Sequence, residues 1–150
     1  VELAERAVRE GFVRVVAAGG DGTVHEVANG VLRAGNPDVT FATLPAGSMN
    51  DYAFALRATR PGGGSFRADV GVVQAGGRER FFVNGLGVGF NGMVALESRK
   101  IRRLRGLPLY VAAFLAAGVR HFRTPEYAVC VDGAEVRTPT LALTVNLGPR

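Results

Sequence analysis

A glycine-rich loop, Gly19-Gly-Asp-Gly-Thr23, follows a β-branched run and precedes a helical pattern, and this order restricts the possible folds more than any other segment. The run at 12–18 is typical of a buried strand. From Val24 to Leu32 the apolar residues recur with the helical period, and Gly35-Asn-Pro37 is a typical helix end. A strand that leads through a glycine loop into a helix is the repeating unit of an α/β layer.

A second unit of the same kind follows along the chain. Residues 40–44 are strand-like, the polar loop Pro45-Ala-Gly-Ser-Met-Asn-Asp51 comes next, and 52–57 are compatible with a helix. A short helix over 2–10 is expected before the first strand. Two such units predict a parallel sheet with both loops at one edge, and ligands of α/β folds bind outside the carboxyl ends of the strands.

The pattern changes after the glycine-rich segment 60–65. Strand-like stretches become frequent, and Gly76-Gly77 and Asp132-Gly133 stand where hairpin turns are expected. The strand-like stretches are 69–74, 80–85, 127–132 and 140–146, and a helical stretch over 91–123 is interrupted at Gly106-Leu-Pro108. We therefore predict two domains, an α/β domain over 1–65 and a mainly antiparallel domain over 66–150.

The glycine loop has the chemistry of a phosphate-binding site. Its glycines let the backbone approach an anion closely, the helix start offers unpaired N–H groups, and Thr23 adds a hydroxyl donor. The loop is neither a Walker A motif nor a Gly-x-Gly-x-x-Gly fingerprint. Asp21 is the candidate for acid-base chemistry or for holding magnesium beside bound phosphates. The alternative is a tight structural turn in which Asp21 only caps the helix.

Further polar residues are expected around this site. His25 is placed either toward a nucleotide or in solvent, and the helix dipole alone explains Glu26 in the first turn. In the second loop, Ser48 is expected to face phosphate, and Asn50 and Asp51 are expected to face the acceptor substrate. An ordinary N-capping cluster is the alternative for the second loop.

Positive charge is concentrated in one part of the chain. Of eighteen basic residues, seven lie in 99–123, where there is no acidic residue. The basic segment, residues 99–105, is expected to bind an anionic membrane surface, where each cation contributes about 1 kcal/mol. Its cations are Arg99, Lys100, Arg102, Arg103 and Arg105. A solvated helix face is the alternative, and nucleic acid is not expected as a partner because no aromatic residues interleave with these cations.

The remaining features concern location. Cys130 is the single cysteine and cannot form an internal disulfide, and its neighbours at 127–131 predict a buried strand. The longest apolar run, 107–119, is shorter than the roughly 20 residues that span a bilayer, and 1–10 do not read as a signal peptide. We expect a cytoplasmic protein that is peripheral at the inner membrane face. The sequence leaves the oligomeric state open, a homodimer included.

Three segments together resemble those of a known family. They are Gly19-Gly-Asp-Gly-Thr-Val-His-Glu26 with Asn29-Gly30, Leu44-Pro-Ala-Gly-Ser-Met-Asn-Asp-Tyr-Ala53, and Phe82-Val-Asn-Gly-Leu-Gly-Val-Gly89. They are similar to the signature of the diacylglycerol kinase catalytic-domain family, which includes bacterial lipid kinases and the sphingosine and ceramide kinases. The first motif alone is shared with NAD kinases and phosphofructokinases, so the resemblance depends on the combination.

The resemblance implies an ATP- and Mg²⁺-dependent kinase that phosphorylates the hydroxyl of diacylglycerol or a related lipid. It implies a Rossmann-like nucleotide-binding domain followed by a β-sandwich domain, both incomplete here: the family's first strand and loop would precede Val1, and its last strands, with a catalytic acid or base and a metal site, would follow Arg150. The isolated segment is therefore expected to be inactive. The family's nucleotide contacts correspond to Gly19, Gly20, Asp21, Gly22, Thr23, Val24, His25 and Ser48.

Three positions depart from the family pattern. Ser48 stands in place of the usual Thr, His25 in place of Asn, and Met49 where a small residue is common. Two other functions remain open at this point. One is a kinase of a soluble acceptor such as NAD, and the other is a regulator that binds nucleotide or membrane without catalysis.

Overall fold

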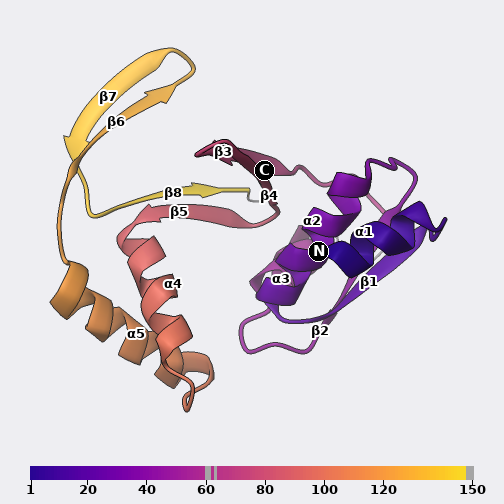
Figure 1. Ribbon diagram of the computed structural model, residues 1–150, viewed down its shortest axis with the longest axis horizontal. Helices are drawn as coiled ribbons and strands as arrows, with labels where there is room; N and C mark the ends of the chain where they lie inside the picture. Colours follow the sequence, from indigo (N-terminus) through magenta and orange to yellow (C-terminus); the bar gives the residue numbers. More distant parts are fainter. Residues whose placement is uncertain (60–61, 63, 148–150) are drawn as a thin grey trace. The chain divides into compact units, whose positions relative to one another are not determined.

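The computed structural model describes residues 1–59, 62 and 64–147. It forms two compact units: the first comprises the described residues of 1–85 together with 146 and 147, and the second comprises 86–145 (Figure 1). Both units contain helices and strands, which confirms the mixed α/β class. Of the glycine-rich segment 60–65, residues 60, 61 and 63 lie outside the described residues. The division into domains at residue 65 stays a prediction.

The first unit begins with the elements predicted around the two loops. Helix α1 (Glu2–Arg9) is followed by β1 (Arg14–Gly19), α2 (Asp21–Ala34), β2 (Thr40–Pro45) and α3 (Asp51–Thr59). Strands β1 and β2 are parallel, in a register that pairs Gly19 with Pro45. Both strands therefore end at the same edge of the sheet, which confirms the predicted position of the loops.

All three helices pack on one face of this small sheet. Val15 and Ala17 of β1 lie on that face within two apolar clusters. The buried helical members of the clusters are Ala4 and Val8 of α1, Val24 and Val31 of α2, and Tyr52 of α3. Val16, on the opposite face, is 53% exposed. A Rossmann-like fold has helices on both faces of its sheet, so that finer assignment stays a prediction.

A hairpin completes the first unit. Strands β3 (Gly71–Ala75) and β4 (Arg78–Phe82) are antiparallel, as predicted from the turn at Gly76-Gly77. The two glycines have φ values of 56° and 71°, the left-handed region that a two-residue hairpin turn of this kind requires.

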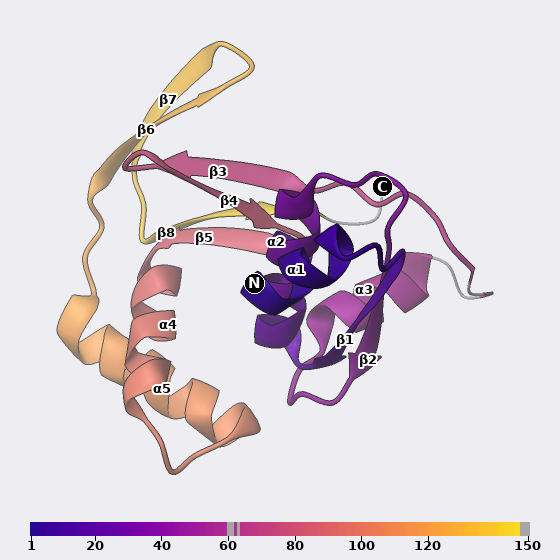
Figure 2. The same cartoon turned by 45° about the vertical axis from the view of Figure 1, so that its right-hand side comes forward.

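A buried asparagine joins this hairpin to α2. Figure 2 shows β4 reaching the side of α2. Asn29 is fully buried. Its Nδ2 donates to the carbonyl oxygens of Phe81 and of His25, both at 2.9 Å, and its Oδ1 accepts the N–H of Phe81 at 3.1 Å. One side chain of α2 therefore pairs with both backbone polar groups of a residue in β4.

The second unit contains two helices and further strand pairs. Its elements are β5 (Gly85–Gly89), α4 (Phe90–Lys100), α5 (Gly106–His121), β6 (Glu126–Val131), β7 (Ala134–Pro139) and β8 (Ala142–Asn146). Strands β6 and β7 form the hairpin predicted around Asp132-Gly133, and β5 pairs with β8. Among the described residues each sheet has two strands, so the β-sandwich stays a prediction.

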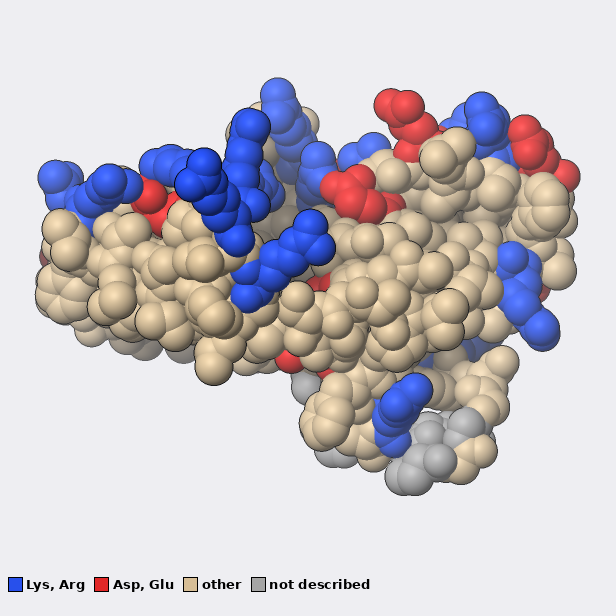
Figure 3. All heavy atoms as spheres, turned by 90° about the horizontal axis from the view of Figure 1, so that it is seen from below, with Lys and Arg blue, Asp and Glu red and all other residues tan. Residues whose placement is uncertain are grey.

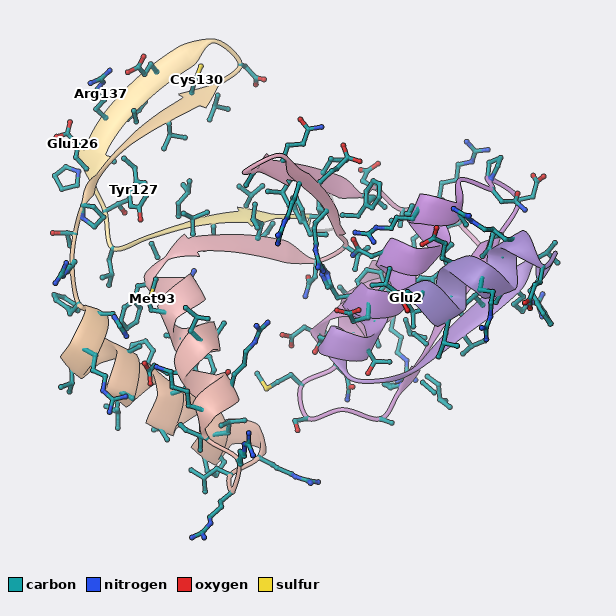
Figure 4. All side chains as sticks on the ribbon, in the orientation of Figure 1. Glu2, Met93, Glu126, Tyr127, Cys130 and Arg137 are labelled. Atoms are coloured by element: carbon teal, nitrogen blue, oxygen red, sulfur yellow. The ribbon has the colours of Figure 1, made fainter. Side chains whose placement is uncertain are left out.

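Two details of this unit differ from the prediction. The helical stretch is interrupted at 101–105 and not at Gly106-Leu-Pro108, because Pro108 falls in the first turn of α5, where proline is tolerated. The strand predicted around Cys130 is present as β6, but its predicted burial is wrong, because Cys130 is exposed near the tip of the β6–β7 hairpin (Figure 4). All residues of β7 are exposed as well, since no layer formed by the described residues covers this strand.

Helices α4 and α5 pack closely through small side chains. Phe90 and Val94 of α4 form a cluster with Ala113 and Ala117 of α5, and both alanines are fully buried. The alanines allow the helix axes to approach each other closely.

A buried carboxylate lies next to this cluster. Glu97 of α4 is 2% exposed. It accepts hydrogen bonds from Lys100 Nζ at 2.7 Å and Arg120 Nη1 at 2.9 Å, and it lies 3.2 Å from His121 Nε2. The hydrogen bond from Lys100 is the largest influence and, with those of His121 and the nearby cations, lowers the pKa of Glu97 although burial opposes this. Glu97 thus ties the end of α4 to the end of α5.

Candidate nucleotide-binding site

The two glycine loops touch backbone to backbone. A Cβ built on Gly20 would lie 3.0 Å from the Cα of Gly47, and a Cβ built on Gly47 would overlap the Cα of Gly20. The N–H of Ala46 donates to the carbonyl oxygen of Gly19 at 3.0 Å. The approach of Gly20 to Gly47 leaves no room for a Cβ on Gly47, so the second loop is held directly beside the start of α2.

Asp21, the predicted catalytic residue, links the same two segments. Its Oδ1 accepts the N–H of Tyr52 at 3.0 Å, so the carboxylate caps the first turn of α3. It makes no capping hydrogen bond to its own helix, which excludes the simple N-cap considered from the sequence. Within the described residues its second oxygen accepts no hydrogen bond, and one carboxylate oxygen is therefore available to a ligand.

The first turn of α2 is open. Gly22 and Thr23 are exposed, and a Cβ built on Gly22 would meet no atom within 4 Å. The first backbone bond of the helix runs from the N–H of Val24 to Gly20 at 3.0 Å. In the part of the chain that the structure describes, the N–H groups of Asp21, Gly22 and Thr23 have no acceptor. A phosphate group fits this turn, because three free donors and the helix dipole favour an anion there.

The other predicted nucleotide residues differ in accessibility. Ser48 is exposed beside the first loop, and His25 is half-buried one turn into α2. Val24 is only 3% exposed and belongs to the core, so its side chain has a packing role. A nucleotide contact by each of these three residues stays a prediction.

Asn50 and Asp51 have separate roles in the second loop. Asn50 has a φ of 58°, and its side chain closes the loop on Gly47, accepting the N–H at 2.9 Å and donating to the carbonyl oxygen at 2.8 Å. Asp51 is exposed at the start of α3, where its negative charge interacts favourably with the positive end of the helix dipole. Binding of the acceptor substrate by Asn50 and Asp51 stays a prediction. To bind an acceptor, the side chain of Asn50 would have to break its two hydrogen bonds to Gly47.

A cavity of about 360 Å³ lies beside Asp21 in the first unit. Its lining residues are Asp21, Val24, His25, Tyr52, Phe82, Val83, Asn84, Gly85 and Asn146. The sequence analysis assigned no role to Tyr52, Asn84 or Asn146, although Asn84 lies within the third segment that resembles the family. Burial raises the pKa of Tyr52 further above its ordinary value of 10.0, so its phenol keeps its proton near neutral pH. The cavity thus places polar groups of different kinds around one carboxylate.

A magnesium site made by the chain alone is not present among the described residues. They contain no group of three or more His, Cys, Asp or Glu side chains that could share a metal ion. Mg²⁺ is commonly held by one or two carboxylates together with substrate phosphates and water. The open oxygen of Asp21 beside the first turn of α2 fits that kind of site.

The basic segment is exposed and belongs to the second unit. Its five cations all lie at the surface. Figure 3 shows exposed Lys and Arg side chains on the face that it draws, with fewer Asp and Glu side chains among them. Lys100 is paired with Glu97. For Arg99, Arg102, Arg103 and Arg105, no ion pair is formed with another described residue. Separately, none of the helices in the described ranges combines the length and apolar character needed to cross a membrane.

Comparison with known proteins identifies the family. Residues 1–80 match the family described as "Diacylglycerol kinase catalytic domain". A protein of Alcanivorax borkumensis named "Probable lipid kinase YegS-like" is 28% identical over 136 residues, which cover 83% of this chain and 43% of that protein. A protein of Staphylococcus aureus (strain JH9) named "Diacylglycerol kinase" is 33% identical over 90 residues, which cover 54% of this chain and 27% of that protein.

The fold is similar to a solved structure as well. The crystal structure of a Bacillus anthracis protein assigned as a diacylglycerol kinase matches 98% of this chain and 52% of its own, with a TM-score of 0.60 at 22% identity. This chain thus spans less than half of the two relatives and about half of the solved chain. The family match covers more than half of this chain and confirms the resemblance seen in the sequence: the chain belongs to the diacylglycerol kinase catalytic-domain family.

Proposed function

We propose that the protein is an ATP-dependent kinase that transfers the γ-phosphoryl group to a lipid hydroxyl, with diacylglycerol or a related lipid as acceptor. The observation that carries this proposal is the open first turn of α2, held against the second loop by the contact of Gly20 with Gly47. Membership of a family whose relatives are named lipid kinase and diacylglycerol kinase supports it.

The phosphates of ATP are proposed to bind at the first turn of α2. The free N–H groups of Asp21, Gly22 and Thr23 donate to phosphate oxygens there, and the hydroxyl groups of Thr23 and Ser48 add two donors. A bound Mg²⁺ ion supplies neutralisation of the charge on the transferring group. Most of the acceleration then comes from positioning and from charge stabilisation.

Asp21 is proposed to hold its carboxylate at the transferring phosphoryl group. One oxygen is fixed by the N–H of Tyr52, and the other is left for a metal ion or for the acceptor hydroxyl. Tyr52 and His25 line the same cavity and restrict where an acceptor can lie. Asp21 is thus proposed to have two roles: one oxygen positions the start of α3, and the other takes part in phosphoryl transfer.

The lipid acceptor is proposed to be reached at an anionic membrane surface on the cytoplasmic side. The exposed arginines of the basic segment supply the attraction, since each cation near such a surface contributes about 1 kcal/mol. A soluble acceptor needs no such segment, so the choice of acceptor tests this part of the proposal.

The test is a phosphoryl-transfer assay of the full-length protein with labelled ATP and a total lipid extract, followed by separation of the products. Wild type is expected to label a lipid, and Asp21→Asn to reduce the rate by about 10²- to 10⁴-fold, the usual range for such groups. Asparagine keeps an oxygen that can accept the N–H of Tyr52, so the thermal midpoint should stay close to that of wild type.

Asp38→Asn is the matched control. Asp38 is an exposed loop carboxylate outside the site, and its neutralisation should leave the rate within about twofold of wild type, as surface changes usually do. In a parallel assay with NAD and sugar phosphates as acceptors, label on these soluble compounds and none on lipid would establish the soluble acceptor instead. Binding of ATP without any transfer would establish the non-catalytic regulator.

A further inference from the structure

Helix α5 carries its large apolar side chains on the outside. The side that packs on α4 is made of small residues, among them the fully buried Ala113 and Ala117. The side away from these alanines, named here the outer face of α5, consists of Leu107, Tyr110, Val111, Leu115 and Val119, which are between 46% and 89% exposed. Phe114 lies at the border of this face, where its ring packs edge-to-face on Phe90 of α4 at a centroid distance of 5.3 Å. A helix of a soluble protein normally buries its largest apolar residues, so this arrangement is the reverse of the expected one.

Cations flank the outer face at both ends. The basic segment leads into α5 at Arg105, and Arg120 and Arg123 follow its last apolar residue. Between Arg105 and Arg120 there is no charged residue, and from 98 to 125 there is no acidic one. The nearest carboxylate, Glu97, is buried and already bonded to Lys100 and Arg120.

We propose that α5 lies in the plane of an anionic lipid bilayer, with its outer face among the upper acyl chains and the arginines of the basic segment at the lipid phosphates. A helix of 16 residues is about 24 Å long, which suits a position in the interface and not across a membrane. Tyr110 has the apolar body and polar tip of residues that favour this depth. This inference rests on the proposed function in one respect: a lipid substrate gives the protein a reason to bind a membrane.

The charges at the two ends favour lipid over a second copy of the chain. If two α5 helices packed through their outer faces, a parallel pair would bring Arg105 next to Arg105. An antiparallel pair would bring Arg105 next to Arg120 and Arg123. Both arrangements place Arg105 beside other cations. Arg120 is already paired with Glu97, but Arg105 and Arg123 form no ion pair with a described residue, and an anionic lipid surface complements both.

The first test uses tryptophan as a reporter, because the chain contains no Trp. Leu115→Trp places the reporter on the outer face, and Phe54→Trp places it at a 75% exposed position of α3 as the matched control. With vesicles that contain anionic lipid, emission of Leu115→Trp should shift to the blue and be quenched by lipids brominated on the acyl chain. Emission of Phe54→Trp should not change. Equal behaviour of the two reporters would overturn the proposal.

The second test separates insertion from charge attraction. Vesicle sedimentation is compared at about 0.1 M and 1 M salt, where the Debye length falls from about 10 Å to about 3 Å. Wild type should keep a salt-resistant fraction, and the combined change Leu107→Gln, Leu115→Gln and Val119→Gln should weaken binding at high salt at least tenfold. Leu3→Gln with Phe54→Gln, two exposed apolar positions elsewhere, should bind as wild type.

The outcomes keep this proposal apart from the kinase proposal. All binding is measured without ATP, and Asp21→Asn should bind vesicles as wild type does. Turnover of detergent-dispersed lipid without vesicle binding would overturn the membrane position of α5 alone. A blue shift of Leu115→Trp that depends on protein concentration in the absence of vesicles would show a second copy on the outer face and would also overturn it.

Discussion

Gly20 and Gly47 lie against each other without side chains between them, and this contact fixes the distance between the two loops of the candidate site. The hydrogen bond from Ala46 to Gly19 and the bond from Tyr52 to Asp21 reinforce it on either side. A change in the second loop is therefore transmitted to the start of α2 through backbone atoms.

Gly47→Ala should separate the two loops. The new Cβ would overlap the Cα of Gly20, and forced overpacking of this kind usually costs about 1–3 kcal/mol. Thermal unfolding should show a lower midpoint, and ATP affinity should fall with it. Gly118→Ala is the control, because a Cβ there meets no atom within 4 Å and alanine favours the helix. Equal midpoints for the two variants would contradict the contact.

Gly22→Val should affect ligand binding far more than folding. The added side chain projects into open space at the first turn of α2, where a phosphate is proposed to bind. Isothermal calorimetry should show ATP affinity at least tenfold weaker, about 1.4 kcal/mol, while the thermal midpoint changes little. If ATP binds the variant as tightly as wild type, the first turn of α2 is only a structural turn.

Asn29→Leu should destabilise the first unit. Leucine has a similar size but leaves the N–H and the carbonyl oxygen of Phe81 without their partner, at a cost of about 1–3 kcal/mol for each buried group. Chemical denaturation should show the loss. Asn91→Leu removes an exposed hydrogen bond to Thr144 and should cost much less. The prediction fails if the two variants are equally stable.

Glu97 should make stability depend on pH. The pKa of Glu97 is lowered in the folded chain. The ionised carboxylate therefore contributes its full stabilisation at a pH above 4.5, the ordinary pKa, and this contribution is lost as the pH falls through the lowered pKa of the folded state. Wild type should exceed Glu97→Gln in thermal midpoint near neutral pH, and the difference should shrink below pH 4.5. Glu126→Gln, an exposed position, should show no such pattern. A difference independent of pH would contradict the ionic role of Glu97.

Local order predicted the first unit well. A strand, a glycine loop and a helix follow one another at 12–34, and short-range periodicity and turn residues are enough to define each element. The hairpin turns at Gly76-Gly77 and Asp132-Gly133 were predictable for the same reason. Strand β5 was not predictable from local pattern, because three of its five residues, Gly85–Gly89, are glycines and no alternation of apolar and polar side chains is visible.

Features that depend on distant contacts could not be predicted. In the sequence, Asn29 is indistinguishable from an ordinary polar residue of a helix. Its hydrogen bonds to the backbone of Phe81 join positions 52 residues apart. The cap that Asp21 provides to α3 likewise depends on the sheet register that brings the two loops together. The apolar composition of α5 predicts burial, whereas the alanines alone are buried and the larger residues stay outside.

The pairing of Asn29 with Phe81 also bears on solubility. Among the described residues, strands β3 and β4 form a sheet of two, so the outer side of each is an edge there. An open edge is a template for pairing with another chain. On β4 the carboxamide of Asn29 already occupies both backbone groups of Phe81, in the way a neighbouring strand would. A foreign strand would have to displace a buried amide before it could extend the sheet. One side chain of α2 thus protects the middle of this edge against aggregation.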